Sequence, residues 1–494
     1  MNKVYKVLFN KSIGKYVVVS ENSKSAKKST KTIQSIVLAA VAFGGTSITM
    51  AAELELGGGT ATGIDAIAIG ERSNASGTLS IALGADSVAQ GVNSAAIGPG
   101  AQVLGNDSVA VGTRAQALEK YSTALGNQSA AEKEFDLAAG YNTIASGGQS
   151  TAVGYAARSK GFASNAIGGS SLAEGKYSTA VGQETHAKAD HTLAAGYKAK
   201  ALGEQSTAVG FNSESRGYGS NAIGSSSLAK GVHSTAIGSS SLAEGDYSIA
   251  LGQESKTGAG KNFATALGYK ANASGWSSFA QGAYAEASGG GSIAIGDSSK
   301  ATTNDTIAIG VLSEANLDNS VALGIRSKTS TNAVTVTSAK VGDITYGGFT
   351  GAVSSVGSQI SVGDTGNERQ IKHVAAGTIS QTSTDAINGS QLFSTQKALG
   401  NLAASTANNL GGGASVASDG SVTSPTYIVT SNPKTPGTKV TAHTVGDALS
   451  ALDSAVNVPL VFKGNTGNDI SKKLGDTLSI KGDLANADAA TATN

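Results

Sequence analysis

A 14-residue motif recurs from about residue 60 to residue 330 and limits what this chain can fold into. Its first half reads Ser-x-Ala-[Ile, Leu or Val]-Gly, and its second half is a looser alternation of small and polar residues that ends in Gly. Nineteen copies align on the glycine that ends the first half, and alanine stands two residues before it in all nineteen. One step measures 16 residues, and TGAGKN is the predicted insertion. The repeat glycines are Gly70, Gly84, Gly98, Gly112, Gly126, Gly140, Gly154, Gly168, Gly182, Gly196, Gly210, Gly224, Gly238, Gly252, Gly268, Gly282, Gly296, Gly310 and Gly324.

The motif predicts two short β-strands per repeat, each ended by glycine. A helix is disfavoured, because glycine costs about 1 kcal/mol at each interior helical position and here recurs about every seven residues. Strands of successive repeats would then pair in parallel, one coil on the next. We therefore expect residues 53–330 to form an all-β head, a parallel β-roll.

The composition supports a stacked fold over a set of compact domains. The 494 residues include 66 glycines, only 5% aromatic residues and no cysteine. Compact cores need large apolar side chains, whose burial contributes roughly 1.5–3 kcal/mol each. The absence of cysteine excludes disulfides, thiolate metal sites and thiol catalysis.

The first strand of the repeat predicts self-association. Both of its faces look largely apolar, so each needs a neighbour, and the second sheet of the same coil can cover only one. Another copy of the chain is the most economical cover for the other, and identical chains usually assemble with closed cyclic symmetry. The invariant alanine suggests a very close backbone approach there, although the sequence leaves open which face meets the symmetry axis. The alternative is a monomeric β-solenoid, such as a secreted enzyme that acts on polysaccharide.

Residues 1–52 have the pattern of an export signal. Residues 1–31 hold eight lysines and one glutamate, an uncharged stretch with the apolar run IVLAAVAF follows, and the segment ends in small residues at 51–52. Without this segment the formal charge of +1 becomes −6, so the basic surface of a nucleic-acid-binding protein is not expected.

The repeat stops after Gly324, and the rest of the chain alternates short β and helical patterns. Segments 333–349 and 357–364 are predicted strands within a neck or connector at 331–393. A short coiled coil is expected at 394–410 and a second at 445–457, where four apolar residues recur at helical spacing. β-rich stalk modules are expected at 411–444, with a hairpin in 414–430, and at 458–494.

Several segments resemble the trimeric autotransporter adhesins of type V secretion. The repeat, for example NSVALGIRS at 319–327, resembles the YadA-like head. GNERQIKHVAAG at 366–377 with DAINGSQL at 385–392 resembles the family's neck, and residues 411–456 resemble its Gly-Gly-containing stalk inserts. The basic N-terminal segment resembles an extended type V signal peptide.

This resemblance implies a left-handed β-roll, a homotrimer with trimeric coiled coils, and display on the outer membrane of a Gram-negative bacterium. It implies a non-enzymatic adhesin for host matrix proteins such as collagen, fibronectin or laminin, or for other cells, and possible roles in autoaggregation or biofilm. The family ends in a C-terminal membrane translocator. None is visible here, so the chain is expected to be a truncated passenger whose outer-membrane anchor is absent.

The candidate site residues follow from these patterns. The collagen-linked N-S-V-A-I-G pattern is met approximately at the C-terminal end of the head, and tyrosines recur directly after the repeat glycine. The ligand-binding candidates are Asn319, Ser320, Val321, Ala322, Leu323, Gly324, Ser327, Tyr141, Tyr155, Tyr197 and Tyr269. Structural neck candidates are Glu368, Arg369, Ile371, Val374 and Leu392, and Glu368 and Arg369 are candidates for interchain ion pairs. No catalytic constellation, metal-ligand spacing or cofactor motif is found, and His186 and His191 are expected on a solvated repeat turn.

Overall fold

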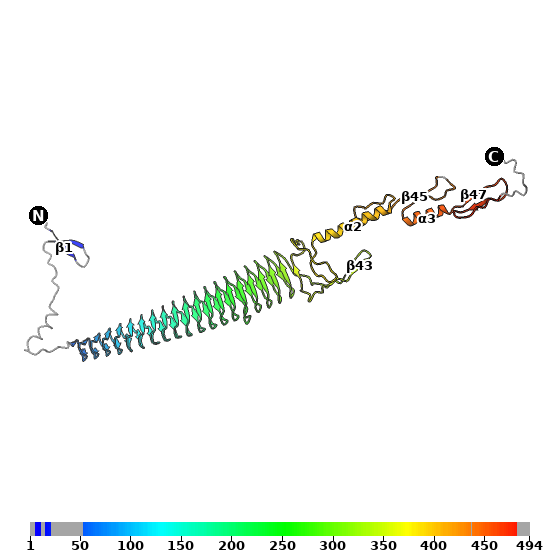
Figure 1. Ribbon diagram of the computed structural model, residues 1–494. Helices are drawn as coiled ribbons and strands as arrows, with labels where there is room; N and C mark the ends of the chain where they lie inside the picture. Colours follow the sequence, from blue (N-terminus) through cyan, green and yellow to red (C-terminus); the bar gives the residue numbers. More distant parts are fainter. Residues whose placement is uncertain (1–4, 11–14, 21–52, 436, 482–494) are drawn as a thin grey trace, which may run out of the picture. The chain divides into compact units, whose positions relative to one another are not determined.

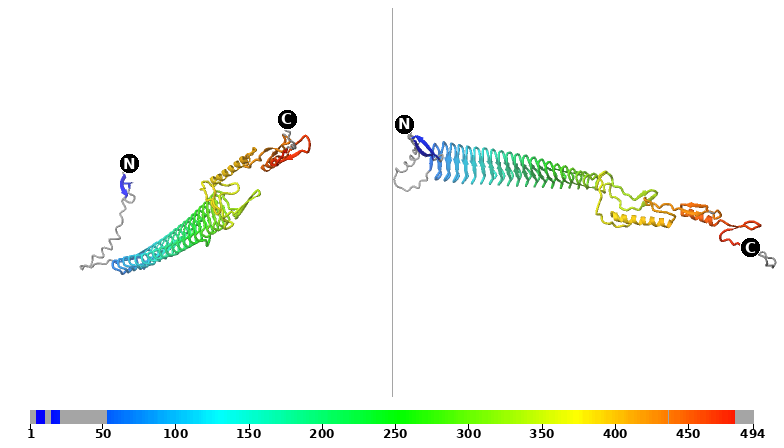
Figure 2. Two further views of the ribbon diagram at one scale, coloured as in Figure 1. Left: turned by 45° about the vertical axis from the view of Figure 1, so that its right-hand side comes forward. Right: turned by 90° about the horizontal axis from the view of Figure 1, so that it is seen from above.

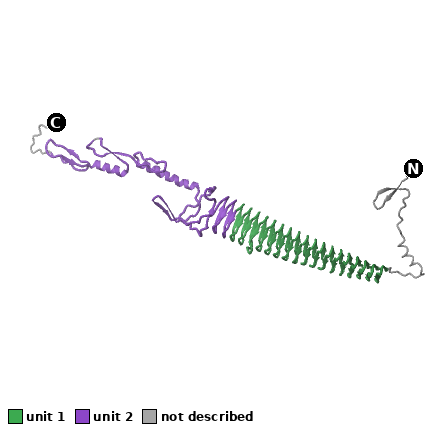
Figure 3. Ribbon diagram, turned by 180° about the vertical axis from the view of Figure 1, so that it is seen from behind, with its two compact units in different colours: residues 1–298 green, residues 299–494 purple. Residues whose placement is uncertain are grey.

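The structure is a computed structural model that describes residues 5–10, 15–20, 53–435 and 437–481. The predicted export signal lies largely outside these residues. Only its strands β1 (Tyr5–Asn10) and β2 (Lys15–Ser20), which pair antiparallel, are described. The chain divides into two compact units, residues 1–298 and 299–494 (Figure 3), which are taken in turn below.

The repeats of the first unit form stacked coils, each with one three-residue and one two-residue strand (Figures 1 and 2). Strands pair in parallel with the strands one repeat away, as Ala82 does with Ala68 and with Ala96. The first sheet contains β3 (Leu54–Leu56), β5 (Ile67–Ile69), β7 (Ile81–Leu83), β9 (Ala95–Ile97), β11 (Val109–Val111), β13 (Thr123–Leu125), β15 (Leu137–Ala139), β17 (Thr151–Val153), β19 (Asn165–Ile167), β21 (Thr179–Val181), β23 (Leu193–Ala195), β25 (Thr207–Val209), β27 (Asn221–Ile223), β29 (Thr235–Ile237), β31 (Ile249–Leu251), β33 (Thr265–Leu267), β35 (Phe279–Gln281) and β37 (Ile293–Ile295). The second sheet contains β4 (Thr60–Ala61), β6 (Asn74–Ala75), β8 (Val88–Ala89), β10 (Gln102–Val103), β12 (Gln116–Ala117), β14 (Ala130–Ala131), β16 (Ile144–Ala145), β18 (Arg158–Ser159), β20 (Leu172–Ala173), β22 (His186–Ala187), β24 (Lys200–Ala201), β26 (Glu214–Ser215), β28 (Leu228–Ala229), β30 (Leu242–Ala243), β32 (Lys256–Thr257), β34 (Asn272–Ala273) and β36 (Glu286–Ala287). The predicted parallel β-solenoid of 14-residue repeats is confirmed, while the handedness of its coil stays a prediction.

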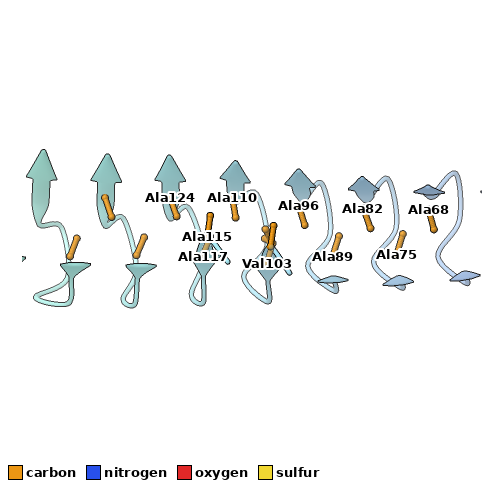
Figure 4. Close-up of a cluster of buried hydrophobic side chains, with 14 of the residues drawn as sticks. Ala68, Ala75, Ala82, Ala89, Ala96, Val103, Ala110, Ala115, Ala117 and Ala124 are labelled. Carbon is orange, nitrogen blue, oxygen red and sulfur yellow. The ribbon is translucent and has the colours of Figure 1, made fainter. Parts of the chain in front are cut away.

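The interior between the two sheets is filled by alanine and serine. Ala82 of the first sheet and Ala75 and Ala89 of the second are completely buried and point into this interior (Figure 4). Many of the buried serines donate their hydroxyls to backbone carbonyls, as Ser87 does to the Gly84 carbonyl at 2.8 Å. Among the described residues, no partner is found for the hydroxyls of Ser80, Ser94, Ser206 and Ser234. The interior is only one small side chain deep on each sheet. The hydrogen bonds between the backbones of successive coils therefore supply stability that large buried apolar side chains supply in globular domains.

Close stacking explains the second recurring glycine of the motif. A Cβ atom on Gly91 would lie 1.9 Å from the carbonyl oxygen of Gly105 in the next coil. No side chain can occupy that space without moving the neighbouring backbone. The spacing of the coils therefore requires the glycine.

Most coils also contain two turn residues in the left-handed region of φ, for example Ser240 at 56° and Tyr247 at 54°. β-branched residues adopt this conformation least readily. Among the residues that the structure describes, no Val, Ile or Thr has a positive φ. The sequence analysis missed these turns, although the absence of β-branched residues at two fixed repeat positions could have indicated them.

In the second unit the coils continue and are then interrupted by a hairpin. Strands β38 (Lys300–Ala301), β39 (Ile307–Ile309), β40 (Glu314–Ala315) and β41 (Val321–Leu323) repeat the earlier pattern. Strand β44 (Ile360–Ser361) pairs in parallel with β41, and the antiparallel hairpin of β42 (Ser338–Val341) and β43 (Ile344–Gly347) lies between them in sequence. The strands predicted over 333–349 and 357–364 are thus shorter than expected, and the first is split by a turn.

Helix α2 (Gly389–Leu410) follows the neck and begins earlier than the predicted start at residue 394. Asn388 caps it, since its side chain accepts from the Gln391 backbone N–H and the Gln391 side chain accepts from the Asn388 backbone N–H. Asn388 also donates to the Val374 carbonyl at 3.1 Å, and Gln391 donates to the Gly377 carbonyl at 2.7 Å. The same two side chains therefore start the helix and fasten the preceding segment to it.

The remaining elements are short. Strands β45 (Tyr427–Thr430) and β46 (Lys439–Ala442) form an antiparallel hairpin, helix α3 (Val445–Val456) follows, and β47 (Leu460–Phe462) pairs with β48 (Ile470–Lys472). The hairpin expected within 414–430 is reduced to a single bridge between Val416 and Val422, because 427–430 pairs with 439–442 instead. Within the described ranges, no helix is both long and apolar enough to cross a membrane.

Candidate binding surfaces

The residues on either side of each buried alanine point outward and form what we call the outer apolar face of the first sheet. Ala96 is completely buried, whereas Ile97 is 37% and Leu251 is 45% exposed in the single chain. The expectation that the invariant alanine marks the approach of another chain was wrong. The alanine faces the interior of its own coil, and the close approach is between the two sheets of that coil.

The four predicted tyrosines lie on the turn that directly follows each repeat glycine, which we call the first edge. Tyr141 stacks on Tyr155 with ring centroids 5.6 Å apart, and Tyr197 stacks on Phe211 at 5.5 Å. Tyr269 meets Tyr284 edge to face at 5.3 Å. All four predicted rings are at least 36% exposed. The first edge thus carries three separate aromatic pairs, and sequence reasoning missed Tyr284, which occupies the second residue of its turn.

Two of these aromatic pairs carry a lysine and a glutamate in the same arrangement. Lys198 Nζ lies 5.0 Å from the ring centroid of Tyr197 and 3.5 Å from Glu184 Oε2. Hydrogen bonding to Tyr197, followed by the charge of Glu184, raises the pKa of Lys198 above its ordinary value. This lysine is therefore held in its charged form on the first edge.

The second place repeats the lysine distances, although its two rings meet edge to face and Lys270 also lies 5.7 Å from the ring centroid of Tyr284. Lys270 Nζ lies 5.1 Å from the ring centroid of Tyr269 and 3.5 Å from Glu254 Oε2. Hydrogen bonding to Tyr269, followed by the charge of Glu254, raises the pKa of Lys270 as well. The recurrence of three residue types at matching distances distinguishes these two places from the Tyr141 pair.

The opposite turn, between the second strand of one repeat and the first strand of the next, forms the second edge. Its longest aromatic column runs through consecutive coils, with centroid separations of 5.3 to 6.5 Å. The column consists of Tyr218, His233, Tyr247, Phe263 and Trp276. The sequence analysis did not predict this column. Two of its four contacts are stacked and two are edge to face, and its Tyr, Phe and Trp rings remain 41–56% exposed.

The two histidines expected together on a repeat turn are separated. His191 lies on the second edge and stacks on Tyr177 at 5.1 Å. His186 instead lies in strand β22, where its Nε2 is 2.8 Å from Glu174 Oε2. The prediction for His186 was wrong because His186 is the first residue of strand β22 and not part of a turn.

The candidate segment 319–327 divides into buried and accessible residues. Ser320, Ala322 and Ser327 are completely buried. Asn319 lies on a left-handed turn with φ 64°, and Leu323 is 45% exposed. Val321 is half-buried, and Gly324 has φ 112° and packs close to the Arg369 guanidinium. Only the residues outside the core can contact a ligand, so any binding role of this segment depends on Asn319, Val321 and Leu323.

Two of the neck candidates, Arg369 and Glu368, make hydrogen bonds within the second unit. Arg369 donates to the Ser327 hydroxyl and to the carbonyls of Ile325 and Val362. Glu368 accepts from the Gly366 backbone N–H at 2.9 Å, which lowers the pKa of Glu368. The Arg369 guanidinium thus donates hydrogen bonds within its own chain. The interchain ion pair between Glu368 and Arg369 stays a prediction. Val374 is half-buried, whereas Ile371 is 71% and Leu392 is 54% exposed.

The families that match this sequence cover the same segments as the coils, the end of the neck and helix α2 of the structure. A family described as "YadA head domain repeat (2 copies)" matches overlapping stretches from residue 61 to residue 327, which together cover more than half of the chain. The chain belongs to the trimeric autotransporter adhesins with YadA-type head repeats. The "Extended Signal Peptide of Type V secretion system" matches residues 1–48, and the "Coiled stalk of trimeric autotransporter adhesin" matches residues 370–415. The predicted signal, repeats and coiled stalk are confirmed.

Three curated relatives of this adhesin family share part of the sequence. The chain is 40% identical over 124 residues to the trimeric autotransporter adhesin AtaA of Acinetobacter sp. (strain Tol 5), 24% of this chain and 3% of that protein. It is 35% identical over 107 residues to the autotransporter adhesin EhaG of Escherichia coli O157:H7, 22% of this chain and 6% of that protein. It is 44% identical over 81 residues to the autotransporter adhesin BtaE of Brucella suis biovar 1 (strain 1330), 16% of this chain and 11% of that protein. The matched part therefore spans a small fraction of each relative.

Two solved structures are also similar to parts of the chain. The C-terminal YadA-like domain of BPSL2063 from Burkholderia pseudomallei is 42% identical with a TM-score of 0.21, and the match covers 25% of this chain and 58% of that one. The collagen-binding domain of the Yersinia adhesin YadA is 24% identical with a TM-score of 0.20, covering 46% of this chain and 86% of that one.

Membership in this family bears on two expectations from the sequence, surface display and the alternative of a secreted enzyme. The chain is a type V secreted surface protein of the Gram-negative adhesins. The family is one of adhesins and not of enzymes, so the alternative of a polysaccharide-degrading solenoid was wrong.

Proposed function

We propose that this chain is the passenger of a homotrimeric surface adhesin that attaches the bacterium to host extracellular matrix or to other cells. The observation that carries the proposal is the outer apolar face of the first sheet. Its aliphatic residues recur in nearly every coil of the first unit and remain partly exposed in the single chain. Burial of such a column contributes roughly 25 cal/mol for each Å² removed from water, so a long repetitive face supports stable association.

The helices of the second unit support the same assembly. In α2, Leu392, Leu399 and Leu402 are all more than half exposed. A helix with an uncovered leucine seam needs a partner in water, because most of the stability of a helix in a protein comes from packing of its apolar face. Parallel copies of α2 would cover these seams with one another.

Helix α3 offers a second apolar seam. Leu449 and Leu452 line an open groove of about 840 Å³ between α3 and β45, together with Val445 and Val456. Side chains of neighbouring copies are the most economical filling for this groove, since each copy presents the same seam.

The ligand-contacting residues proposed are the exposed members of the candidate set. These are Asn319 at the end of the repeat and Tyr141, Tyr155, Tyr197 and Tyr269 on the first edge, whereas Val321 and Leu323 lie on the outer apolar face that the proposed trimer would cover. Collagen, fibronectin and laminin are the proposed matrix partners. Three copies of a shallow site would bind through avidity, which can exceed single-site affinity by about 10²–10⁴-fold without new contacts.

Two measurements test this function separately. Light scattering on the secreted chain should give the mass of three copies, and a mass of one copy would exclude the trimer. Binding of the trimer to immobilised collagen, fibronectin and laminin should be measured against an albumin surface. No binding to any of the three would remove the matrix proposal and leave the assembly unaffected.

A further inference from the structure

Two places on the first edge share an arrangement that the assembly of the chain does not require. Each has a tyrosine, a lysine on the following residue, a glutamate from the preceding coil and an aromatic ring in the next coil. The first place consists of Glu184, Tyr197, Lys198 and Phe211, and the second of Glu254, Tyr269, Lys270 and Tyr284. The recurrence at matching distances indicates a built site.

The polar groups at these places are loosely bonded to one another. The two lysine–glutamate separations are both 3.5 Å, and the Tyr197 hydroxyl lies 3.4 Å from Glu184 Oε1. These separations exceed the usual 2.7–3.2 Å of a good hydrogen bond. All four charged side chains are also 40–44% exposed. Ammonium donors and carboxylate acceptors therefore remain accessible to hydroxyl groups of a ligand.

The charges at each place cancel. One lysine faces one glutamate, so a polyanion would meet a carboxylate wherever it met an ammonium group. An uncharged ligand with both hydroxyl donors and hydroxyl acceptors meets no such repulsion. The adjacent rings of Phe211 and Tyr284, more than half exposed, offer apolar surface at the same place. This combination suits a pyranose sugar, which has an apolar C–H face and a rim of hydroxyl groups.

The segment of the first edge between the two places is lined by small polar side chains. Four exposed serines and a glutamine follow Phe211 in the next coils. They are Ser225, Ser226, Ser239, Ser240 and Gln253. The two lysine–tyrosine pairs are five coils apart in the repeat, which at ~4.8 Å per coil corresponds to about 24 Å. A hydroxyl-rich surface of this length between two aromatic anchors fits an extended chain better than a single sugar.

We propose that the first edge between Tyr197 and Tyr284 binds an uncharged glycan chain, with the two lysine–tyrosine–glutamate groups as its anchors. Sugar hydroxyls donate to the glutamates and accept from the lysines, and sugar rings lie against the aromatic side chains. This inference rests on the proposed adhesive function and names a ligand class for one edge of the head.

The experiment measures binding of the secreted chain to N-acetylchitohexaose and maltohexaose, the neutral probes, and to a hyaluronan hexasaccharide, the anionic probe. We expect at least one neutral probe to bind. The double variant Tyr197→Ala/Tyr269→Ala should raise its Kd about tenfold or more. Lys198→Met/Lys270→Met keeps all aromatic rings and should also weaken binding.

The matched control is Tyr247→Ala/Phe263→Ala, which removes a stacked aromatic pair on the second edge, away from the proposed glycan site. It should leave the Kd unchanged. Circular dichroism and light scattering on every variant verify fold and assembly, and collagen binding of the unsubstituted chain keeps a failure of this inference separate from a failure of the adhesive function. No binding of either neutral probe, equal losses in test and control variants, or preference for hyaluronan would overturn the proposal.

Discussion

Arg369 lies 42 residues after Ser327 in the chain, and its Nη1 donates to the Ser327 hydroxyl at 3.0 Å. The same guanidinium donates to the carbonyls of Ile325 and Val362. A residue of the neck thus donates hydrogen bonds to polar groups at the end of the last 14-residue repeat, where the backbone N–H groups of a further repeat would otherwise donate.

Replacement of Arg369 should loosen this end of the repeat. Arg369→Met is expected to lower the local free energy of unfolding by about 1 kcal/mol, since three hydrogen bonds are lost while water replaces part of them at an exposed group. Hydrogen exchange of residues 321–328 measures the effect. Arg326→Met is the control, an exposed arginine of the same coil, and equal exchange in both variants would contradict the capping role.

Charge on the outer apolar face should weaken assembly. Ile223→Glu/Ile237→Glu would bury unpaired carboxylates at an interface, which costs several kcal/mol. Light scattering over a dilution series should then show dissociation of the trimer at a higher protein concentration than in the wild type. Leu228→Glu/Leu242→Glu, on the outer face of the second sheet, should dissociate as the wild type does. Equal dissociation of both variants would mean that the outer apolar face is not an interface.

The central alanines should tolerate no enlargement. Ala222 is completely buried between the two sheets, so Ala222→Leu is expected to cost about 1–3 kcal/mol through overpacking. The neighbouring Asn221→Leu changes a residue that points outward and should cost much less in the single chain. Chemical denaturation of both variants under conditions that keep the chain monomeric checks the prediction, which similar losses would refute.

The left-handed turns should reject β-branched residues. Ser240 has φ 56°, so Ser240→Val is expected to destabilise its coil by about 1–2 kcal/mol. Ser239 precedes it, is equally exposed and has no positive φ, so Ser239→Val is the matched control. Thermal unfolding should separate the two variants, and coincident curves would argue against strain at this turn.

The ion pairs of Glu174 should contribute a small amount to the free energy of unfolding, and this contribution should be lost in acid. Its pKa is lowered by hydrogen bonds, first from Lys160 and then from His186. A carboxyl whose folded-state pKa is depressed stabilises the fold above its ordinary pKa of 4.5, and that stability is lost as the pH falls through the lowered value. Because the side chain is partly exposed, the effect should be less than about 1 kcal/mol.

The variant Glu174→Gln should therefore be less stable than the wild type at pH 7, and the two should converge well below pH 4.5. Denaturation series across this range measure the difference. In Lys160→Met, which removes the main cause of the shift, the difference should be smaller. A gap between wild type and Glu174→Gln that stays constant with pH would exclude the assignment.

The repeat architecture could be predicted because each glycine and alanine meets its own equivalent in the next coil. Ala82 pairs with Ala68 and Ala96, which stand one period before and after it. This pairing is the same for a left-handed and a right-handed coil, so a constant period is enough to predict parallel stacking. The aromatic contacts were less predictable. Tyr284 and Trp276 occupy different repeat positions from the rings they touch, and only the turn geometry brings them into contact.

The sequence by itself therefore determined the repeat period and the pairing of short strands. It also determined the stalk helices and the family resemblance. Only the tertiary structure decided that the alanines face inward, because alternation along a strand defines two faces but alanine is small enough for either one. Only the folded chain could reveal the bond between Arg369 and Ser327, since a contact between residues far apart in sequence depends on where the intervening hairpin returns the chain.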